Sequence, residues 1–434
     1  MRKMKDSGIE WIGEIPEDWD MVKTNSFCST ITDYVASGSF ASLAENVVYI
    51  DEPDYAMLVR TMDVSGKGYS GKPVYINKHS YDFLSNSNLF GGEIMFPNIG
   101  ASVGDVYIVP KLYERMSLAP NAIMVKTTVC DKFVYYYFCS DAGRLSLLDI
   151  AQSTAQPKFN KTDFRQLRVV MPSKEEQEKI ANLLDENCSE IDDVISKTKS
   201  TIEEYKRLRQ AMIAEAVTKG IRSNRRMKES GIKWVKSIPA EWDGIAPKAL
   251  FALRKDKAQA GEKQLTASQQ YGVIYQDEYM ELTGTRIVTV EKDFDILKHV
   301  EAGDFVISMR SFQGGLEYSE KSGSISSAYV MLIPDLNLVY PRFYKWLFKS
   351  SVYINALQST SNLVRDGQAM RYSNFVQVRL YTVPLEEQKE IAGYLDNKCA
   401  EIDTLIEKKT ALLAEMEAYK KSVIYEYVTG KREV

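Results

Sequence analysis

Two stretches of the chain carry apolar residues at spacings of three, four or seven, which predicts long amphipathic helices with a near-heptad stripe. Pro172 and Pro384 precede them, and Gly220 and Gly430 stand at their ends, as helix start and stop signals. The first stripe is Ile180, Leu184, Ile191, Ile195, Ile202, Tyr205, Leu208, Met212 and Ala216. The second is Ile391, Leu395, Ile402, Ile406, Leu413, Met416, Tyr419, Val423 and Tyr427.

Each predicted helix has one apolar stripe and therefore needs a partner. We expect the two to pair as an antiparallel coiled coil, because a large insert separates them in sequence. In the alternative, each helix packs separately on its own domain.

The inserts, roughly 21–170 and 244–382, show short alternating or β-branched runs joined by glycines, a pattern typical of strands and turns. Predicted strands lie within 55–64, 92–99, 303–310 and 328–334. The apolar run 133–139 is either a buried strand or a piece of helix. Both inserts are predicted to be α/β domains.

The chain repeats itself in register. Residues 4–20 and 227–243 share ten of seventeen positions at an offset of 223, and 175–197 returns as 386–408 at an offset of 211 from Gln177 onward. The inserts barely resemble each other, although Phe164 and Arg168 match Phe375 and Arg379, and the glycines at 92 and 303 can be aligned. We call the repeated segments the frame of the molecule. Two similar frame halves that carry two dissimilar inserts predict a pseudo-twofold molecule that recognises two different targets.

The predicted fold class is therefore two similar α/β recognition domains joined by two long antiparallel helices that form a coiled coil. The predicted segments are a first domain at 1–172, a central spacer helix at 173–222, a second domain at 223–384 and a C-terminal spacer helix at 385–434.

Composition and charge limit the kinds of function and cellular location that the sequence predicts. The formal net charge is −4, which is unlike a simple DNA-binding protein, but segment 223–384 alone has 21 basic and 17 acidic residues. A nucleic-acid surface must therefore be local. None of the five cysteines forms a C-x-x-C pair, and Cys188 and Cys399 are repeat mates best explained by core packing. No signal peptide or membrane-spanning run is expected, which predicts a cytoplasmic protein.

Enzyme motifs are absent from the sequence. There is no P-loop, no methyltransferase-type glycine-rich loop and no Asn-Pro-Pro-aromatic tetrad. The two histidines, His79 and His299, have no second metal ligand nearby in sequence. These absences favour a non-catalytic binding protein and predict no metal site.

Two repeated elements carry a family resemblance. Trp11, Ile15, Pro16 and Trp19 match Trp234, Ile238, Pro239 and Trp242, and each set follows a Ser-Gly-Ile triplet. The Glu-Glu-Gln-(x)2-Ile-Ala-(x)2-Leu-Asp element begins at Glu175 and again at Glu386. With the phrase LTASQQYGVIYQDEY at 265–279, this order over the whole chain resembles specificity subunits of type I restriction–modification systems.

The resemblance implies that each domain reads one half of a split target in double-stranded DNA, and that the paired helices set the gap between the halves. It also implies that two methylation subunits dock on the helical frame and that restriction subunits join them. S-adenosylmethionine, ATP and Mg would belong to those partners, with no cofactor in this chain.

Arg, Asn and Gln read bases, while Lys and Tyr commonly hold phosphate. Candidate DNA-binding residues, chosen on glycine- or serine-rich joints, are Arg60, Lys67, Tyr69, Lys72, Asn98, Lys158, Gln269, Gln270, Tyr271, Arg286, Arg310, Gln313, Arg365, Gln368 and Arg371. Candidate frame residues, which pack or receive a partner, are Trp11, Trp19, Trp234, Trp242, Gln177 and Gln388. Charged residues of the helices, among them Glu176 and Arg209, are most simply solvated, or else receive a partner.

Two other functions compete. A coiled-coil scaffold without DNA readout would not need two diverged globular domains. An enzyme with an unrecognised site would need a constellation of catalytic residues that the sequence does not display.

Overall fold

The computed structural model describes residues 2–65, 72–151, 156–287, 289, 296–309, 311–360 and 370–434. By its contacts the chain divides into two units, Met1–Lys199 with Ala411–Val434, and Ser200–Thr410. Each unit holds one insert, the first part of one long helix and the last part of the other. The division cuts both predicted helix segments, and the four-segment description stays a prediction.

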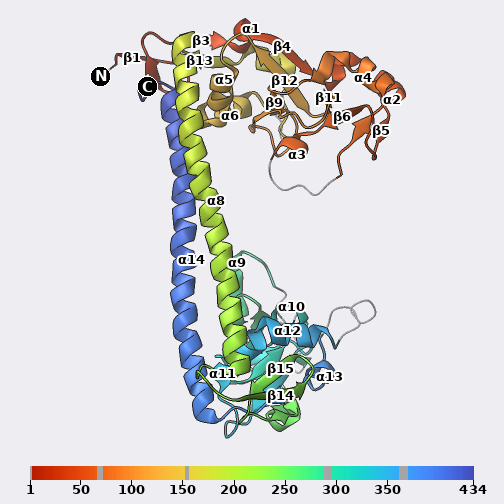
Figure 1. The fold of residues 1–434 in the computed structure, drawn as a ribbon, viewed down its shortest axis with the longest axis vertical. Helices are drawn as coiled ribbons and strands as arrows, with labels where there is room; N and C mark the ends of the chain where they lie inside the picture. The colour runs from red at the N-terminus through yellow and green to blue at the C-terminus, as the bar shows by residue number, and fades with distance from the viewer. Residues whose placement is uncertain are drawn as a thin grey trace. The chain divides into compact units, whose positions relative to one another are not determined.

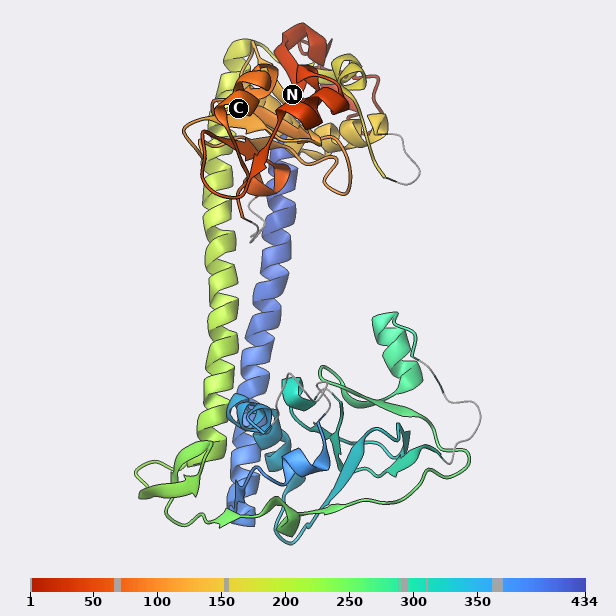
Figure 2. The same ribbon diagram turned by 90° about the vertical axis from the view of Figure 1, so that its right-hand side faces the viewer.

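The two long helices are present. Helix α8 runs over Lys174–Lys219 and α14 over Leu385–Val428, close to the predicted bounds. In the first unit they lie side by side, and Lys420 bonds Asp192 at 2.7 Å while Lys199 lies 3.4 Å from Glu417 (Figure 1 and Figure 2). Residue numbers rise along α8 while the numbers of the contacting residues on α14 fall, so the two helices run antiparallel.

In the second unit the same pairing is marked by Arg209 and Asp403, 2.9 Å apart. The antiparallel coiled coil is confirmed, and separate helices are not what forms. Much of the predicted stripe is buried, including Ile180, Leu184, Ile391 and Leu395. Leu208 and its repeat mate Tyr419 are exceptions, each 51% exposed.

The first unit has two main sheets, and Figure 1 labels some of their strands. One has the order β10-β9-β12-β4 and is antiparallel throughout, and the other, β5-β7-β6-β11-β8, contains one parallel pair, β6 with β11. Pairs β1-β2 and β13-β3 complete the unit. The strands are β1 (Met4–Asp6), β2 (Glu14–Pro16), β3 (Asp20–Lys23), β4 (Cys28–Asp33), β5 (Tyr49–Ile50), β6 (Ala56–Val59), β7 (Tyr75–Ile76), β8 (Asn88–Leu89), β9 (Ile94–Pro97), β10 (Tyr107–Ile108), β11 (Met116–Leu118), β12 (Ala122–Thr127) and β13 (Arg168–Met171).

The helices of this unit include, besides the start of α8 and the end of α14, α1 (Thr24–Phe27), η1 (Tyr34–Ser37), α2 (Phe40–Asn46), α3 (Thr61–Val64), α4 (Lys78–Phe83), η2 (Ser85–Ser87), α5 (Asp131–Cys139), α6 (Asp141–Ile150) and α7 (Lys161–Gln166). The largest core joins α5 and β9 to the start of α8 and the end of α14, and contains Phe96, Phe133, Leu184 and Val428. Burial of this apolar surface holds the first domain on the helices.

In the second unit the main sheet has the order β17-β24-β21-β22, beside the pairs β14-β15, β16-β25, β18-β19 and β20-β23. The strands are β14 (Met227–Ile232), β15 (Val235–Pro239), β16 (Gly244–Ile245), β17 (Phe251–Leu253), β18 (Leu265–Ser268), β19 (Gly272–Tyr275), β20 (Lys298–Val300), β21 (Phe305–Ile307), β22 (Glu317–Tyr318), β23 (Gly323–Ile325), β24 (Val330–Pro334) and β25 (Leu380–Tyr381). The helices include η3 (Pro247–Ala249), α9 (Gln276–Thr283), α10 (Ser311–Gly314), α11 (Pro341–Lys349), α12 (Ser351–Gln358) and α13 (Tyr372–Phe375).

Aromatic side chains dominate the second core. Trp242 stacks on Tyr381 with ring centroids 5.1 Å apart and planes at 17°, and Phe251 meets Tyr344 edge to face at 5.2 Å. The same cluster includes Ile213 and Leu395 of the two long helices. This domain is therefore held on the helices in the manner of the first.

Most strand predictions are confirmed in part. The four predicted runs contain β6, β9, β21 and β24, but 61–64 forms α3 instead, and 133–139 lies within the helix α5. The alignment of the inserts at Gly92 and Gly303 is supported by the backbone, because both glycines have positive φ, 93° and 106°, just before β9 and β21. The two inserts thus share a local framework under diverged surfaces.

His299, on β20, is held between two carboxylates. Its Nδ1 lies 2.7 Å from Glu262 Oε1 and its Nε2 lies 3.0 Å from Glu301 Oε2. Partial burial favours the neutral imidazole, but the hydrogen bonds to Glu301 and Glu262 outweigh it and raise the pKa of His299 above its usual 6.5.

A group with a raised folded-state pKa stabilises the fold fully below its unfolded pKa and loses that effect as pH rises through the folded value. We expect the melting temperature of the second unit to fall as pH rises above about 6.5, and His299→Gln to remove that part of the fall. Thermal unfolding between pH 6 and pH 9 measures it, with the exposed His79→Gln as control. Identical pH profiles for the wild type and His299→Gln would contradict the assignment.

Candidate functional site

The β1–β2 hairpin of the first unit is fixed to the first turn of α8 by four residues, which we name the first corner cluster: Arg2, Asp18, Trp19 and Glu176. Trp19 Nε1 donates to Glu176 Oε2 at 2.9 Å, and Arg2 Nη1 donates to Glu176 Oε1 at 2.6 Å. Arg2 also pairs with Asp18 at 2.7 Å, and its guanidinium lies 5.3 Å from the Trp19 ring centroid. The Arg2 guanidinium is permanently charged, and its hydrogen bonds to Glu176 and Asp18 raise the pKa of Arg2 further.

The second corner cluster repeats this arrangement with Arg225, Glu241, Trp242 and Glu387. Trp242 Nε1 donates to Glu387 Oε2 at 3.1 Å, Arg225 pairs with both Glu387 and Glu241, and its guanidinium lies 5.5 Å from the Trp242 ring. The Arg225–Glu387 ion pair is more deeply buried than the Arg2–Glu176 ion pair. The side chains of Arg225 and Glu387 are 9% and 1% exposed, against 22% and 23% for Arg2 and Glu176.

The two frame glutamines are buried next to these clusters and satisfy backbone groups. Gln177 Nε2 donates to Pro172 O at 2.9 Å and its Oε1 accepts from Cys130 N at 3.1 Å. Gln388 makes the equivalent bonds to Val383 O and Tyr340 N, each at 2.7 Å. Each glutamine therefore ties the start of a long helix to the segment that leads into α5 or α11.

The remaining frame tryptophans are half-buried and differ between units. Trp11 Nε1 donates to Ser146 Oγ at 3.2 Å, whereas Trp234 Nε1 donates to Arg379 O at 2.8 Å. Each of these two bonds joins a repeated hairpin to its domain. All four tryptophans therefore make contacts inside the protein, either with a long helix or with the domain.

A second repeated contact was not singled out from the sequence. Asp185 accepts from Tyr136 Oη at 2.7 Å, and its mate Asp396 accepts from Trp346 Nε1 at 2.9 Å. Lys132 pairs with Asp185 as Arg342 pairs with Asp396. The signal was present, because both aspartates close the repeated Glu-Glu-Gln element. Their partners also lie on matching segments, in which Phe133 and Phe138 align with Phe343 and Phe348 at an offset of 210.

The described candidate readers of the first insert form two pairs. Arg60, which caps α3, donates Nη2 to Asp63 at 2.7 Å and to Lys72 O at 3.0 Å, and the Lys72 side chain is exposed. Asn98 Nδ2 donates to Phe159 O at 3.1 Å, beside the exposed Lys158. Lys158 lines a hollow of about 800 Å³.

In the second insert, Gln269, Gln270 and Tyr271 form the exposed turn between β18 and β19. The Gln269 side chain lies against Gly314 at the end of α10, so this turn and the helix that carries the exposed Gln313 are neighbours. The turn forms one wall of a groove of about 560 Å³ whose other lining includes Arg209, Tyr318, Lys321, Lys345, Trp346 and Lys349.

The remaining candidates are dispersed or lie outside the described residues. Arg286 is exposed beyond α9, and Arg371 is exposed at the start of α13, where its backbone N donates to Asn374 Oδ1 at 3.0 Å. The candidates that lie outside the described residues are Lys67, Tyr69, Arg310, Arg365 and Gln368.

Two buried carboxylates at equivalent places were also missed from the sequence. Glu93 accepts from the backbone N of Phe90 at 2.9 Å, and Asp304 accepts from the backbone N of Glu301 at 3.0 Å. Each sits one residue after the aligned glycine and pairs with a cation, Lys126 or Arg254. They brace the start of β9 and β21 and so support the adjoining loops.

Across the described ranges, no cluster of three His, Cys, Asp or Glu side chains is arranged to hold a metal ion. None of the helices in that part of the chain is both long and apolar enough to cross a membrane. Cys188 and Cys399 are buried at equivalent places, and burial raises the pKa of both thiols, as expected for packing residues.

Comparison with known proteins finds a family model and relatives that are similar to this chain in sequence. Residues 16–204 match the family model described as the type I restriction modification DNA specificity domain. The putative type I restriction enzyme MjaX specificity subunit of Methanocaldococcus jannaschii is 24% identical over 447 residues, which cover 97% of this chain and 95% of the relative. The MjaVIII specificity subunit of the same organism is 23% identical over 96% of this chain and 93% of its own length.

Solved structures share the fold. A chain from a study of complex assembly and conformational transition of the type I R-M system aligns with a TM-score of 0.66 at 14% identity, covering 96% of this chain and 99% of that one. The HsdS subunit from Thermoanaerobacter tengcongensis aligns with a TM-score of 0.50 at 14% identity, over 96% and 98% of the two chains.

Proposed function

Because the chain belongs to the family of type I restriction–modification specificity subunits, we propose that it is the sequence-specific DNA-binding subunit of such a complex. Each domain reads one half of a split target in double-stranded DNA, and the paired helices set the gap. The observation that carries this proposal is the duplicated set of anchoring contacts, in the corner clusters and at Gln177 and Gln388, beneath domain surfaces that differ. A protein scaffold would not need one frame to present two diverged domains.

The chain acts without catalysis of its own in this proposal. Two methylation subunits dock on the helical frame, restriction subunits join them, and S-adenosylmethionine, ATP and Mg are used in those partners. The exposed repeat mates Leu208 and Tyr419 support docking on the helices, because a partner in two copies requires equivalent apolar positions in both units.

We further propose that base and phosphate contacts come from the candidate residues on the loops of each insert. Among the described candidates the β18–β19 turn is the best placed, because Gln270 and Tyr271 are exposed at its tip. The groove beside it holds three lysines, Lys321, Lys345 and Lys349, each of which is paired with a carboxylate. A glutamine can bond adenine through two hydrogen bonds, and a lysine can neutralise phosphate.

The proposal is tested by sequencing modified bases in DNA from cells that express this chain with its cognate methylation subunit. We expect a methylated motif made of two short halves around a fixed gap. The variant Gln270→Ala/Tyr271→Ala is expected to relax or abolish one half only, while Gln259→Ala, at another exposed position of the same unit, leaves the motif intact. An intact complex that yields no split motif would overturn the proposed function.

A further inference from the structure

We propose that the two corner clusters are positioning sites, each of which sets the selectivity for one half of the DNA target by fixing one recognition domain on the helix that follows it. The inference rests on the proposed DNA-recognition function. It assigns no contact with DNA to the clusters. Their effect is transmitted through the repeated hairpin and the start of a long helix.

The two clusters use the same chemistry at the same place in the helix. Glu176 is the third residue of α8 and Glu387 is the third residue of α14, where a carboxylate is also favoured by the helix dipole. Each accepts one bond from a tryptophan ring and two from an arginine that precedes the hairpin. Three side chains from two segments thus fix the direction in which the helix leaves the domain.

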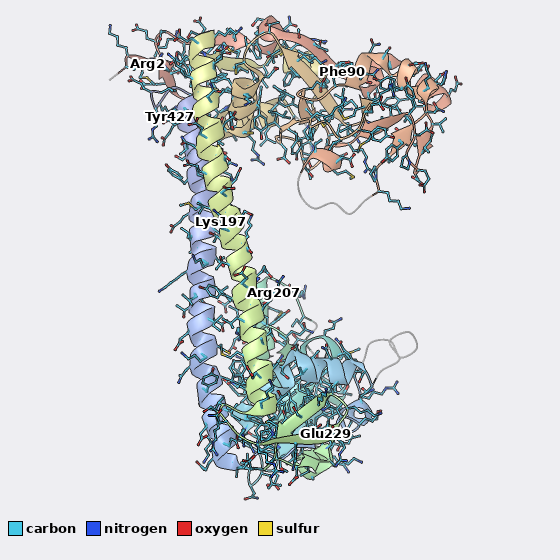
Figure 3. The ribbon with its side chains drawn as sticks, in the orientation of Figure 1. Arg2, Phe90, Lys197, Arg207, Glu229 and Tyr427 are labelled. Carbon is cyan, nitrogen blue, oxygen red and sulfur yellow. The ribbon has the colours of Figure 1, made fainter. Side chains whose placement is uncertain are left out.

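In the first unit the hairpin also contacts the end of the opposite helix. Tyr425 Oη and Lys431 Nζ both donate to Ile12 O, at 3.3 and 2.5 Å. A Cβ added to Gly430 would lie 2.3 Å from Pro16 Cγ, so the chain just after α14 lies directly on the hairpin. Figure 3 labels Arg2 and Tyr427 at this corner of the first unit.

The second unit brings the same parts together. A Cβ added to Gly220, just after α8, would lie 2.5 Å from Arg225 Nη1 and 2.8 Å from Glu387 Oε1. Tyr381 Oη donates to Val217 O near the end of α8, and the Tyr381 ring stacks on Trp242. The end of one helix, the start of the other and the domain therefore meet at a single buried ion pair.

Such a junction matters for recognition because base contacts tolerate little displacement. A recognition constellation has to be held to within about 0.5 Å, and the reading loops lie on the domain, not on the helix. A small rotation at the corner moves every loop of that domain together. Loss of a cluster should therefore lower the discrimination between bases in one half-site and leave discrimination in the other half-site unchanged.

The chain supplies matched controls. Glu175 and Glu386 directly precede the cluster glutamates, have the same side chain, and are 80% and 79% exposed. The substitutions Glu176→Gln and Glu387→Gln remove the charge from a cluster, whereas Glu175→Gln and Glu386→Gln remove the same charge from the adjacent exposed position.

The experiment measures binding of the full chain, assembled with its methylation subunits, to duplexes that carry the methylated motif or one mismatch in either half. We expect Glu387→Gln to lower mismatch discrimination at least about tenfold in one half-site, and by less than about twofold in the other. Glu176→Gln should act on the opposite half-site and more weakly, because its pair is more exposed. The two control variants should keep the wild-type discrimination in both halves.

Trp19→Phe and Trp242→Phe keep an aromatic ring and the glutamate's charge, while they remove the bond from the indole N–H to the glutamate and part of the buried ring system. They carry the test if a charge variant fails to fold. Unchanged discrimination, or equal loss in both half-sites, would overturn the inference. Absence of a split site for the wild-type complex would instead overturn the proposed function.

Discussion

Insertion of one heptad into each long helix is expected to lengthen the gap between the two half-sites by about three base pairs. Seven helical residues add about 10.5 Å, and one base pair occupies about 3.4 Å along duplex DNA. Copies of 193–199 and 404–410, placed after Lys199 and after Thr410, put the insertions at repeat mates in the two helices. An insertion of seven residues keeps the apolar stripe of each helix directed at the other helix. Modified-base sequencing reads the new gap directly.

The control inserts three residues at the same two places, which turns the stripe away from its partner. That variant should lose the methylated motif, because the contacts marked by Lys420–Asp192 and Arg209–Asp403 cannot reform on both sides of the insertion. The heptad variant should keep both half-site sequences. If it methylates the original motif with the original gap, the helices do not set the spacing.

The helices could be predicted closely because periodicity and helix-end residues are local properties of the sequence. What the stripe could not show is which part of it the domains and the other helix would cover. Ile180 and Leu184 are covered by a domain core, whereas Leu208 and Tyr419 occupy equally regular positions and are half exposed. Burial along a helix depends on tertiary contacts that its own pattern does not encode.

The site was predicted unevenly for a similar reason. The four tryptophans and both glutamines stand in the repeats and were named as candidates. Glu176 was interpreted as solvated or else as receiving a partner, and Arg2 and Arg225 were not singled out. A charged residue in a sequence does not reveal its partner, and the partners here come from segments more than 150 residues away. Repetition showed that the frame was important without showing its chemistry.

Loop residues are harder still to judge from sequence. Arg60 and Asn98 were chosen as readers for their side-chain chemistry, and in the structure both make hydrogen bonds within the first insert. Gln270 and Tyr271, chosen on the same grounds, are exposed at the tip of a hairpin. The sequence supplies the donor and acceptor groups, while the turn geometry decides which of them face outward.

Trp242→Ala is expected to destabilise the second unit by about 3–5 kcal/mol, the cost of removing a large buried aromatic side chain. The indole is 0% exposed, stacks on Tyr381 and donates to Glu387, so the substitution opens a cavity and removes one partner of a buried carboxylate. A chain with two units need not unfold in one step, so local opening free energies from hydrogen exchange are the suitable measurement. Amides of β14, β15 and the first turns of α14 should show the loss. Leu336→Ala, at a side chain 67% exposed, should change them by less than about 0.5 kcal/mol. A loss for Trp242→Ala no larger than that of Leu336→Ala would show that the second corner cluster does not hold the unit together.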